Sequence, residues 1–197
     1  MQRFIVFLLA LVSLGSACDP SYLDNGRLTR DGYELRPAAL PWLVVAEGSF
    51  EHATVVDDAI EWWNGQGVGV LFEGGIDDAE FDALVLAPIG SRYGVILASV
   101  ESIPGGGVEW LDVDEENPNG DALVLDDGEG SIVACDVRVD FEIAYHEPTE
   151  RVTLIHELGH CLGLADDPES IDLDSCMSSP TYDGCGLTPG DLALLRE

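Results

Sequence analysis

The residues that could do chemistry are concentrated in the segment HELGHCLGLADD, which runs from His156 to Asp167. His156 and His160 are four residues apart, so on an α-helix both imidazoles leave the same face. That spacing suits two ligands of one tetrahedral zinc ion. Glu157 is rotated about 100° around the helix from His156, so its carboxylate can lie over an open metal position and take a proton from water there. The pattern H-E-x-x-H therefore predicts a zinc site in which Glu157 is the catalytic residue.

A zinc site of this kind needs a third protein ligand, and the residues after the motif show whether the match is more than chance. Gly163 can take the positive φ that ends a helix and turns the chain. Such a turn can bring Asp166 back to the metal. No histidine follows His160, so this turn cannot supply a third histidine ligand. Asp167 is a neighbouring alternative, although the spacing favours Asp166. The predicted metal ligands are therefore His156, His160 and Asp166.

From His156 to Asp166 the sequence reads H-E-x-x-H-x-x-G-x-x-D, which resembles the long zinc signature of the metzincin metalloproteases. Most metzincins have histidine at the last position; a minority, the snapalysin-like secreted bacterial enzymes among them, have aspartate there. The resemblance covers about residues 41–197 and implies a matrixin-like or snapalysin-like zinc peptidase. It also implies a methionine turn beneath the metal, and Met177 in the segment CMSSP stands where that turn should be. The alternative for Met177 is a methionine that fills a gap in the core.

The helices and strands that would position this site follow from the apolar pattern. Residues 50–63 and 149–162 show helical periodicity, and the second of these helices carries the motif. Thr188 can cap a short final helix over residues 189–195. Apolar runs predict strands over residues 42–46, 68–72, 83–87, 95–100, 121–125 and 133–142, the last of them half-buried because apolar and polar residues alternate. We therefore predict the α+β class: a single mixed β-sheet backed by two main helices, with a methionine turn and a short C-terminal helix, as in the metzincins.

Five cysteines, at positions 18, 135, 161, 176 and 185, fit an exported protein. If Cys18 carries lipid, four remain and can pair in three ways. Cys161 lies on the face of the motif helix that points away from the metal ligands, and Cys135 lies on the apolar face of its strand. These two faces should meet, so we predict a Cys135–Cys161 disulfide. Cys176 and Cys185 would then close the loop after the methionine turn, and each bridge would contribute about 2–4 kcal/mol.

The N-terminus is typical of an export signal. Arg3 precedes an apolar run over residues 4–14, which is shorter than the ~20 residues that span a bilayer. We predict a signal peptide over residues 1–17, because Gly15-Ser16-Ala17-Cys18 resembles a bacterial lipobox in which Cys18 becomes lipidated; ordinary signal cleavage is the alternative. Residues 18–40 would be the lipidated N-terminus and a tether, and residues 41–197 the peptidase domain. The protein would be lipid-anchored to the bacterial cell envelope, facing the periplasm or the cell surface, or secreted if the lipobox is not used.

The charge of the chain limits its partners. Asp and Glu number 38 against 8 Lys and Arg, and the net charge of -30 argues against binding nucleic acid or an anionic membrane surface. Contact with a membrane would occur only through the lipid anchor, and the expected partner of this monomer is a protein or peptide substrate. Two acidic runs, residues 112–117 and 126–129, could bind a structural Ca²⁺ ion, as the matrixin resemblance also implies, but solvated loops are the simpler interpretation.

Together these patterns predict a zinc-dependent endopeptidase that hydrolyses peptide bonds by Glu-assisted attack of zinc-bound water. His156, His160 and Asp166 would hold the metal, and Glu157 would act as general base. Two alternatives remain: a metalloprotease-like binding lipoprotein that is catalytically inactive, and an enzyme dedicated to a single partner. An intact Glu157 argues against the first, because an inactive site has no need for a base. The small size of the chain leaves the second open.

Overall fold

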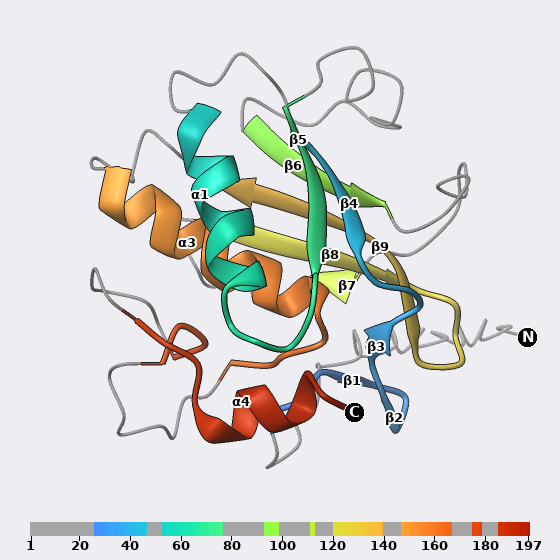
Figure 1. The fold of residues 1–197 in the computed structure, drawn as a ribbon. Helices are drawn as coiled ribbons and strands as arrows, with labels where there is room; N and C mark the ends of the chain where they lie inside the picture. The colour runs from blue at the N-terminus through green and yellow to red at the C-terminus, as the bar shows by residue number, and fades with distance from the viewer. Residues whose placement is uncertain are drawn as a thin grey trace, which may run out of the picture.

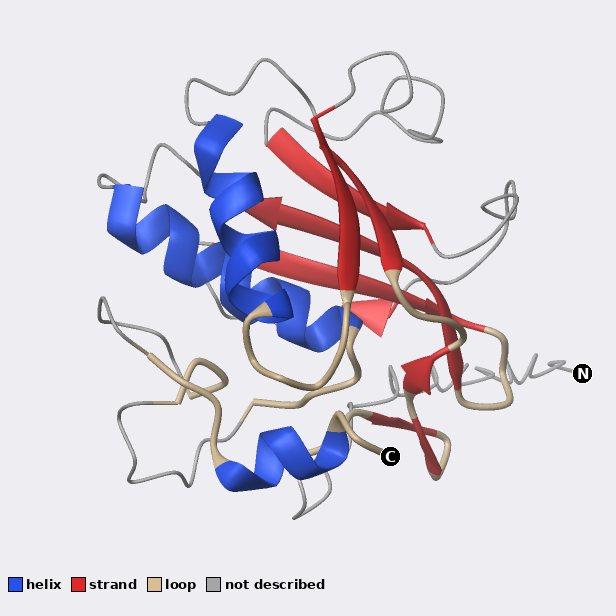
Figure 2. Ribbon diagram, viewed as in Figure 1, coloured by secondary structure: helices blue, strands red, loops and turns tan. Residues whose placement is uncertain are grey.

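The computed structural model describes residues 26–46, 53–76, 93–98, 111–112, 120–139, 147–166, 175–178 and 185–197. The helices are α1 (Ala53–Asn64), α3 (Glu147–Cys161) and α4 (Pro189–Leu194). The strands are β1 (Thr29–Arg30), β2 (Tyr33–Glu34), β3 (Arg36–Pro37), β4 (Trp42–Ala46), β5 (Phe72–Ile76), β6 (Tyr93–Ala98), β7 (Leu111–Asp112), β8 (Gly120–Asp126) and β9 (Ser131–Val139). The predicted α+β class is confirmed for this part of the chain (Figure 1, Figure 2).

Seven strands form one mixed sheet in the order β5-β4-β6-β9-β8-β7, with β3 paired to β9 beside this path. Strands β4 and β5 are parallel, as are β3 and β9, and the other neighbours are antiparallel. The prediction of a single mixed sheet therefore holds for the main sheet. Strands β1 and β2 add a separate two-stranded antiparallel sheet that the sequence analysis did not predict.

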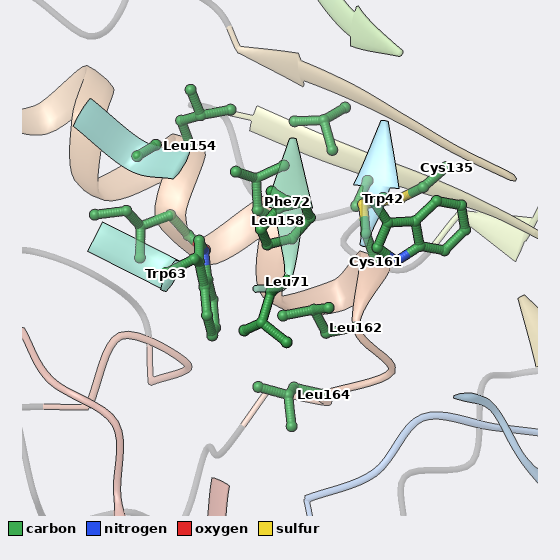
Figure 3. Packing of buried hydrophobic residues seen from close by; sticks show 14 of the residues in the cluster. Trp42, Trp63, Leu71, Phe72, Cys135, Leu154, Leu158, Cys161, Leu162 and Leu164 are labelled. Atoms are coloured by element: carbon green, nitrogen blue, oxygen red, sulfur yellow. A yellow bond between two sulfur atoms is a disulfide. The ribbon is translucent and has the colours of Figure 1, made fainter. Parts of the chain in front are cut away.

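Both long helices pack against the main sheet and against each other (Figure 1): α3 lies on β8 and β9, and α1 lies on β5. The indole nitrogen of Trp63 in α1 donates to the carbonyl of Ile155 in α3 at 3.0 Å, which fixes one helix against the other. Apolar side chains that are almost fully buried fill the space between these elements (Figure 3), among them Trp42, Trp63, Phe72, Leu154 and Leu158. Burial of each such side chain contributes about 1.5–3 kcal/mol, so the motif helix α3 rests on a well-filled core.

Strand β5 begins where the sequence predicts a strand to end. The apolar run at residues 68–72 predicts that strand, but β5 starts at Phe72, and Gly67 and Gly69 take positive φ values of 75° and 118° in the turn that precedes it. The side-chain oxygen of Asn64 accepts hydrogen bonds from the N–H groups of Leu71 at 2.8 Å and Phe72 at 3.1 Å. The end of α1 thereby sets the start of β5, an interaction that apolar patterning does not report. The strand predicted at residues 83–87 lies outside the described residues.

Strand β9 is more deeply buried than its alternating pattern predicts. Cys135 and Val137 are buried on one face, and Ala134 and Asp136 on the opposite face are only 1 % and 8 % exposed. β9 is also an inner strand, paired with β6 on one side and β8 on the other. The prediction of a half-buried strand is therefore wrong for these residues, because polarity at Asp136 did not signal exposure.

Residues 26–40 belong to the fold, whereas the sequence predicts a tether over residues 18–40. Strand β3 pairs in parallel with β9, and Leu28 and Leu35 are each 1 % exposed within the core. Two isolated leucines among Gly, Arg and Asp residues show no periodicity, which is why the sequence pattern did not assign them to the core. The folded part therefore begins at or before Gly26. The signal peptide, Cys18 and the rest of the predicted tether lie outside the described residues.

Two disulfides connect the motif helix and its surroundings. Cys135–Cys161 links β9 to the end of α3, and Cys176–Cys185 closes a short loop before α4, so both predicted pairings are confirmed. Disulfides are consistent with an exported protein, since they persist in oxidising compartments. Within the described ranges, none of the helices has the length and apolar character needed to cross a membrane.

Candidate metal centre

The three motif residues lie in the second half of α3 and are buried. His156, Glu157 and His160 are 1 %, 0 % and 0 % exposed. Each offers one ligand atom, and these atoms lie within 4.8 Å of one another, so the group could hold a metal ion. Polar and charged side chains are rarely buried together unless they are paired or coordinate a metal. The helical spacing read from the sequence therefore produces the predicted cluster.

Asp166 forms a tighter group with the two histidines. Its Oδ1 atom lies 3.2 Å from Nε2 of His156 and 3.7 Å from Nε2 of His160, and the two Nε2 atoms are 3.2 Å apart. Ligand atoms around a tetrahedral zinc ion with bonds of about 2.0–2.1 Å stand about 3.3–3.4 Å apart. The three atoms therefore match one face of such a tetrahedron. Asp166 fits the third ligand position better than Glu157, because its oxygen lies close to both imidazoles, and Asp167 lies outside the described residues.

The predicted turn at Gly163 brings Asp166 to the histidines. Gly163 has a φ of 81°, and its N–H donates to the carbonyl of His160 at 2.9 Å, which closes the end of α3. A Cβ atom at this position would also collide with the carbonyl oxygen of Leu35. Glycine is therefore required at residue 163 for its positive φ and for the close approach of the Leu35 backbone.

Each histidine is oriented by a backbone carbonyl. Nδ1 of His156 lies 2.8 Å from the carbonyl oxygen of Cys176, and Nδ1 of His160 lies 2.9 Å from that of Leu164. A carbonyl can only accept, so each Nδ1 carries a proton, and each Nε2 faces the candidate site, where it can bind a metal through its lone pair once it is deprotonated. Partners of this kind fix the tautomer and the orientation of metal-binding histidines. The sequence analysis missed both carbonyls, because every residue has one and no pattern marks it.

The charge state of Asp166 also suits a metal ligand. Burial raises the pKa of this carboxyl, but the hydrogen bond with His156 and the charges of His160 and His156 lower it more, so the net pKa lies below the ordinary value of aspartate. Asp166 therefore presents a carboxylate, not a carboxylic acid, to the two imidazoles at neutral pH.

Met177 lies beneath the motif helix, where the metzincin resemblance places a methionine. Met177 is fully buried, and its thioether lies so close to Gly159 that a Cβ atom there would collide with the sulfur. Trp63 closes the same space from α1. Residue 159, directly before the second motif histidine, must therefore be small. Met177 is also part of the hydrophobic core, so the role of gap-filling side chain describes its packing equally well.

The turn that contains Met177 is held in place by α4. Ser175 pairs with Gly186 in an isolated parallel bridge, and its hydroxyl donates to Oδ2 of Asp191 at 3.5 Å. The same Oδ2 atom accepts from the N–H and the hydroxyl of Thr188, both at 2.9 Å, in a capping box that starts α4. The predicted cap at Thr188 is confirmed, whereas the link from Asp191 to the turn is a connection between residues that are distant in sequence and was missed.

The acidic run at residues 126–129 is organised by its own loop. Oδ2 of Asp126 pairs with Arg30 at 2.8 Å, and Oδ1 of Asp127 accepts from the N–H groups of Glu129 at 2.8 Å and Ser131 at 3.0 Å. The N–H groups of Ser131 and Glu129 lower the pKa of Asp127 below its usual range. These contacts give both aspartates a structural role without a cation. Calcium binding stays a prediction, and residues 113–117 of the other acidic run lie outside the described residues.

Comparison of the chain with protein families, with curated proteins and with solved structures gave no match. The resemblance to the metzincins therefore rests on the motif residues themselves, namely His156, Glu157, His160, Gly163, Asp166 and Met177.

Proposed function

We propose that this chain is a zinc-dependent endopeptidase of the metzincin type. His156, His160 and Asp166 hold the metal, and Glu157 acts as the general base. The observation that carries this proposal is the triangle formed by Nε2 of His156, Nε2 of His160 and Oδ1 of Asp166, with edges of 3.2, 3.2 and 3.7 Å. Glu157, on the same turn of α3, is the one further carboxylate of the motif.

The donor set favours zinc over Mg²⁺ and Ca²⁺. Two imidazole nitrogens and one carboxylate oxygen make three protein ligands, the number typical of catalytic zinc, whereas structural zinc sites have four. Mg²⁺ and Ca²⁺ prefer oxygen ligands, so two imidazoles make either of them a poor fit. When bound, zinc supplies Lewis-acid chemistry: it polarises a carbonyl group and makes water a better nucleophile near neutral pH.

The side chains of this chain divide the remaining work. Glu157 is fully buried beside the ligands and accepts the proton of the attacking water, then passes it to the amine that leaves. Asp166 contributes a negative charge, and the carbonyls of Cys176 and Leu164 hold the two imidazoles in one orientation. This division assigns Glu157 to proton transfer and leaves metal binding to the other three residues.

Export and attachment to the bacterial envelope are part of the same proposal. The two disulfides support an oxidising location, and the signal-like residues 1–17 support export. Lipidation at Cys18 would keep the peptidase beside the membrane, with protein or peptide substrates as partners and no role for nucleic acid. The resemblance of residues 15–18 to a lipobox is the support for this step.

The test compares the full exported protein with Glu157→Gln and His156→Ala on a mixed peptide library, with zinc content measured for each. Glu157→Gln keeps the shape of the side chain and should retain zinc while losing roughly 10²–10⁴-fold in activity, because general-base catalysis contributes that much. His156→Ala should lose both zinc and activity, as should the wild type treated with a chelator.

A folded, zinc-loaded wild type that cleaves no library peptide would contradict general endopeptidase activity. The protein would then be a dedicated enzyme or an inactive binding lipoprotein. Equal activity of the wild type and Glu157→Gln would remove Glu157 from the mechanism.

A further inference from the structure

The N-terminal segment Gly26–Leu28 lies alongside the turn that brings Asp166 to the candidate metal centre. Arg27 pairs with Leu164 in an antiparallel bridge. The N–H of Leu28 donates to the carbonyl of Gly163 at 2.9 Å, and the N–H of Ala165 donates to the carbonyl of Gly26 at 2.8 Å. Asp166 follows Ala165 directly, so the backbone next to the third ligand is hydrogen-bonded to a segment more than a hundred residues earlier in the chain.

Leu164 connects this segment to a second ligand. Its carbonyl oxygen lies 2.9 Å from Nδ1 of His160, while the residue itself forms the bridge with Arg27. Displacement of Leu164 would therefore rotate or release the His160 ring and move Asp166 at the same time. Two of the three proposed metal ligands thus depend on how firmly Gly26–Leu28 is held.

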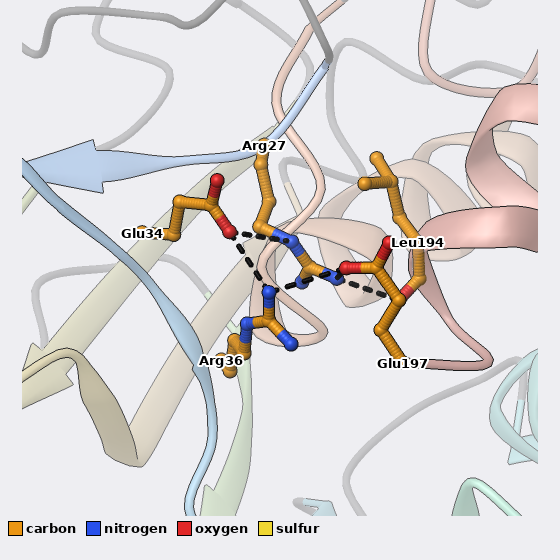
Figure 4. Close-up of polar contacts among 5 residues, drawn as sticks. All are labelled: Arg27, Glu34, Arg36, Leu194 and Glu197. Carbon is orange, nitrogen blue, oxygen red and sulfur yellow. Dashed lines mark hydrogen bonds and ion pairs between the residues drawn. The ribbon is translucent and has the colours of Figure 1, made fainter.

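The side chain of Arg27 links the segment to α4 (Figure 4). It is 3 % exposed, and its Nη2 atom donates to the carbonyl of Leu194 in α4 at 2.6 Å. Glu34 and Glu197 lie 3.6 Å from its guanidinium nitrogens, and Arg36 joins the same two carboxylates at 2.9 and 3.2 Å. A buried guanidinium requires such partners, because an unpaired buried charge is strongly destabilising. Arg27 therefore ties the N-terminal segment to the C-terminal helix.

We propose that Arg27 is a positioning residue for the candidate metal centre. By fastening Gly26–Leu28 to α4, it holds Leu164 and the backbone before Asp166 in the arrangement that metal binding needs. This inference rests on the proposed function, because it requires Asp166 to be a metal ligand. The competing interpretation is that the Arg27 cluster only joins the two ends of the fold and adds general stability.

The test is a double-mutant cycle on zinc affinity, measured by competition with a chromogenic chelator on the full chain. Arg27→Met keeps an unbranched stem out to the position of Nε and removes the donors of the guanidinium. It should weaken zinc binding roughly 10–100-fold, the usual effect of losing a partner that orients a ligand. Arg36→Met is the matched control: Arg36 contacts the same two glutamates, but it is 44 % exposed, and it should leave the affinity unchanged within about twofold, the usual error of such measurements.

The cycle with Asp166→Asn separates positioning from general stability. If Arg27 acts through Asp166, Arg27→Met should weaken zinc binding much less in the Asp166→Asn background than in the wild type. The visible spectrum of the Co²⁺-loaded protein should change in the same direction in Arg27→Met and in Asp166→Asn, since both alter the third ligand. Arg36→Met should keep the wild-type spectrum.

A folded Arg27→Met protein with wild-type zinc affinity would overturn the inference. So would losses for Arg27→Met that multiply in full both with those of Asp166→Asn and with those of His160→Ala, because these are the two ligands that Arg27 is inferred to position. If Arg27→Met does not fold, Arg27→Lys decides by the same measurements, because it keeps the charge but cannot serve Leu194, Glu34 and Glu197 together. Failure of the proposed function would give a different result: His156→Ala and Asp166→Asn would then bind zinc with the same affinity as the wild type. In that case the Arg27 inference falls as well.

Discussion

The Nδ1 atom of each histidine in the candidate metal centre lies against a backbone carbonyl. The carbonyls of Cys176 and Leu164 belong to segments that are themselves held by α4 and by Gly26–Leu28. The contacting atoms belong to the backbone, so a substitution at either residue affects the contact only by moving the backbone. At the residue scale, the site is therefore sensitive to changes that move the backbone, and least sensitive to changes that only exchange exposed side chains.

Gly159 offers the sharpest test at this scale. In a helix, Gly→Ala normally stabilises by about 1 kcal/mol. Here the added Cβ would collide with the sulfur of Met177, and overpacking of this kind costs about 1–3 kcal/mol. Gly159→Ala should therefore lower the free energy of unfolding, measured by urea denaturation. In a Met177→Ala background, where only Trp63 at 3.3 Å stays close to the added Cβ, the same substitution should cost less stability.

An equal effect of Gly159→Ala in the wild-type and Met177→Ala backgrounds would show that Met177 does not press on the motif helix. The matched control is Gly65→Ala, just beyond α1, where the nearest atoms are carbonyl oxygens of Glu61 and Trp62 at 3.2 and 3.3 Å and no side chain is in the way. Any effect there should not depend on the residue at position 177.

At the scale of elements, α3 is fixed on several sides. The sheet supports one side through Cys135–Cys161, α1 contributes the Trp63 hydrogen bond to Ile155, and the turn at residues 175–178 contacts His156. The two disulfides therefore serve different contacts. Cys135–Cys161 joins the motif helix to the sheet. Cys176–Cys185 closes a loop that begins at Cys176, and the carbonyl of Cys176 orients His156.

The two disulfides should therefore differ in what is lost when both cysteines of a pair are replaced by alanine: one loss should fall mainly on stability and the other mainly on zinc affinity. From their sequence separations of 26 and 9 residues, loop-closure entropy assigns about 3.5 kcal/mol to Cys135–Cys161 and about 2.6 kcal/mol to Cys176–Cys185. Loss of the first should therefore cost more stability. Loss of the second should cost more zinc affinity, about tenfold, because it frees the carbonyl that orients His156.

Urea denaturation and chelator competition on the two double variants measure these effects, and each variant is the control for the other. Equal losses of zinc affinity would show that the loop closed by Cys176–Cys185 has no special role at the site.

At the scale of the whole molecule, charge and chain ends matter most. The chain has 38 acidic and 8 basic residues, and at a net charge of -30 its carboxylates repel one another. Within the described part of the fold, each of three basic residues pairs with a carboxylate: Arg27, Arg30 and Arg36. Arg27 and Arg36 both pair with Glu197, so residues far apart in sequence lie side by side (Figure 1, Figure 4).

Repulsion on this scale predicts that salt stabilises the fold. The Debye length falls from about 30 Å at 0.01 M to about 8 Å at 0.15 M salt, which screens repulsion between surface carboxylates. The midpoint of urea denaturation should therefore rise over this range, equally in NaCl and KCl because the effect is one of screening. A midpoint that falls with added salt would show that the ion pairs of the arginines outweigh the net repulsion.

The sequence alone determined the features that depend on local spacing. Helical periodicity placed His156 and His160 on one face, the strand pattern and helix face predicted Cys135–Cys161, and Thr188 was identified as a cap. These assignments succeed because the period of a helix or strand and the chemistry of a cap act over only a few residues.

Only the tertiary structure decided the partners that come from distant parts of the chain. Residues 26–40 show no periodicity, and yet Arg27 reaches Leu194, 167 positions away, and Gly26–Leu28 borders the turn that carries Asp166. The carbonyls of Leu164 and Cys176 could not be found from sequence either, since backbone groups are the same at every residue. Spacing therefore predicted which residues form the candidate site, and long-range packing decided what holds them in place.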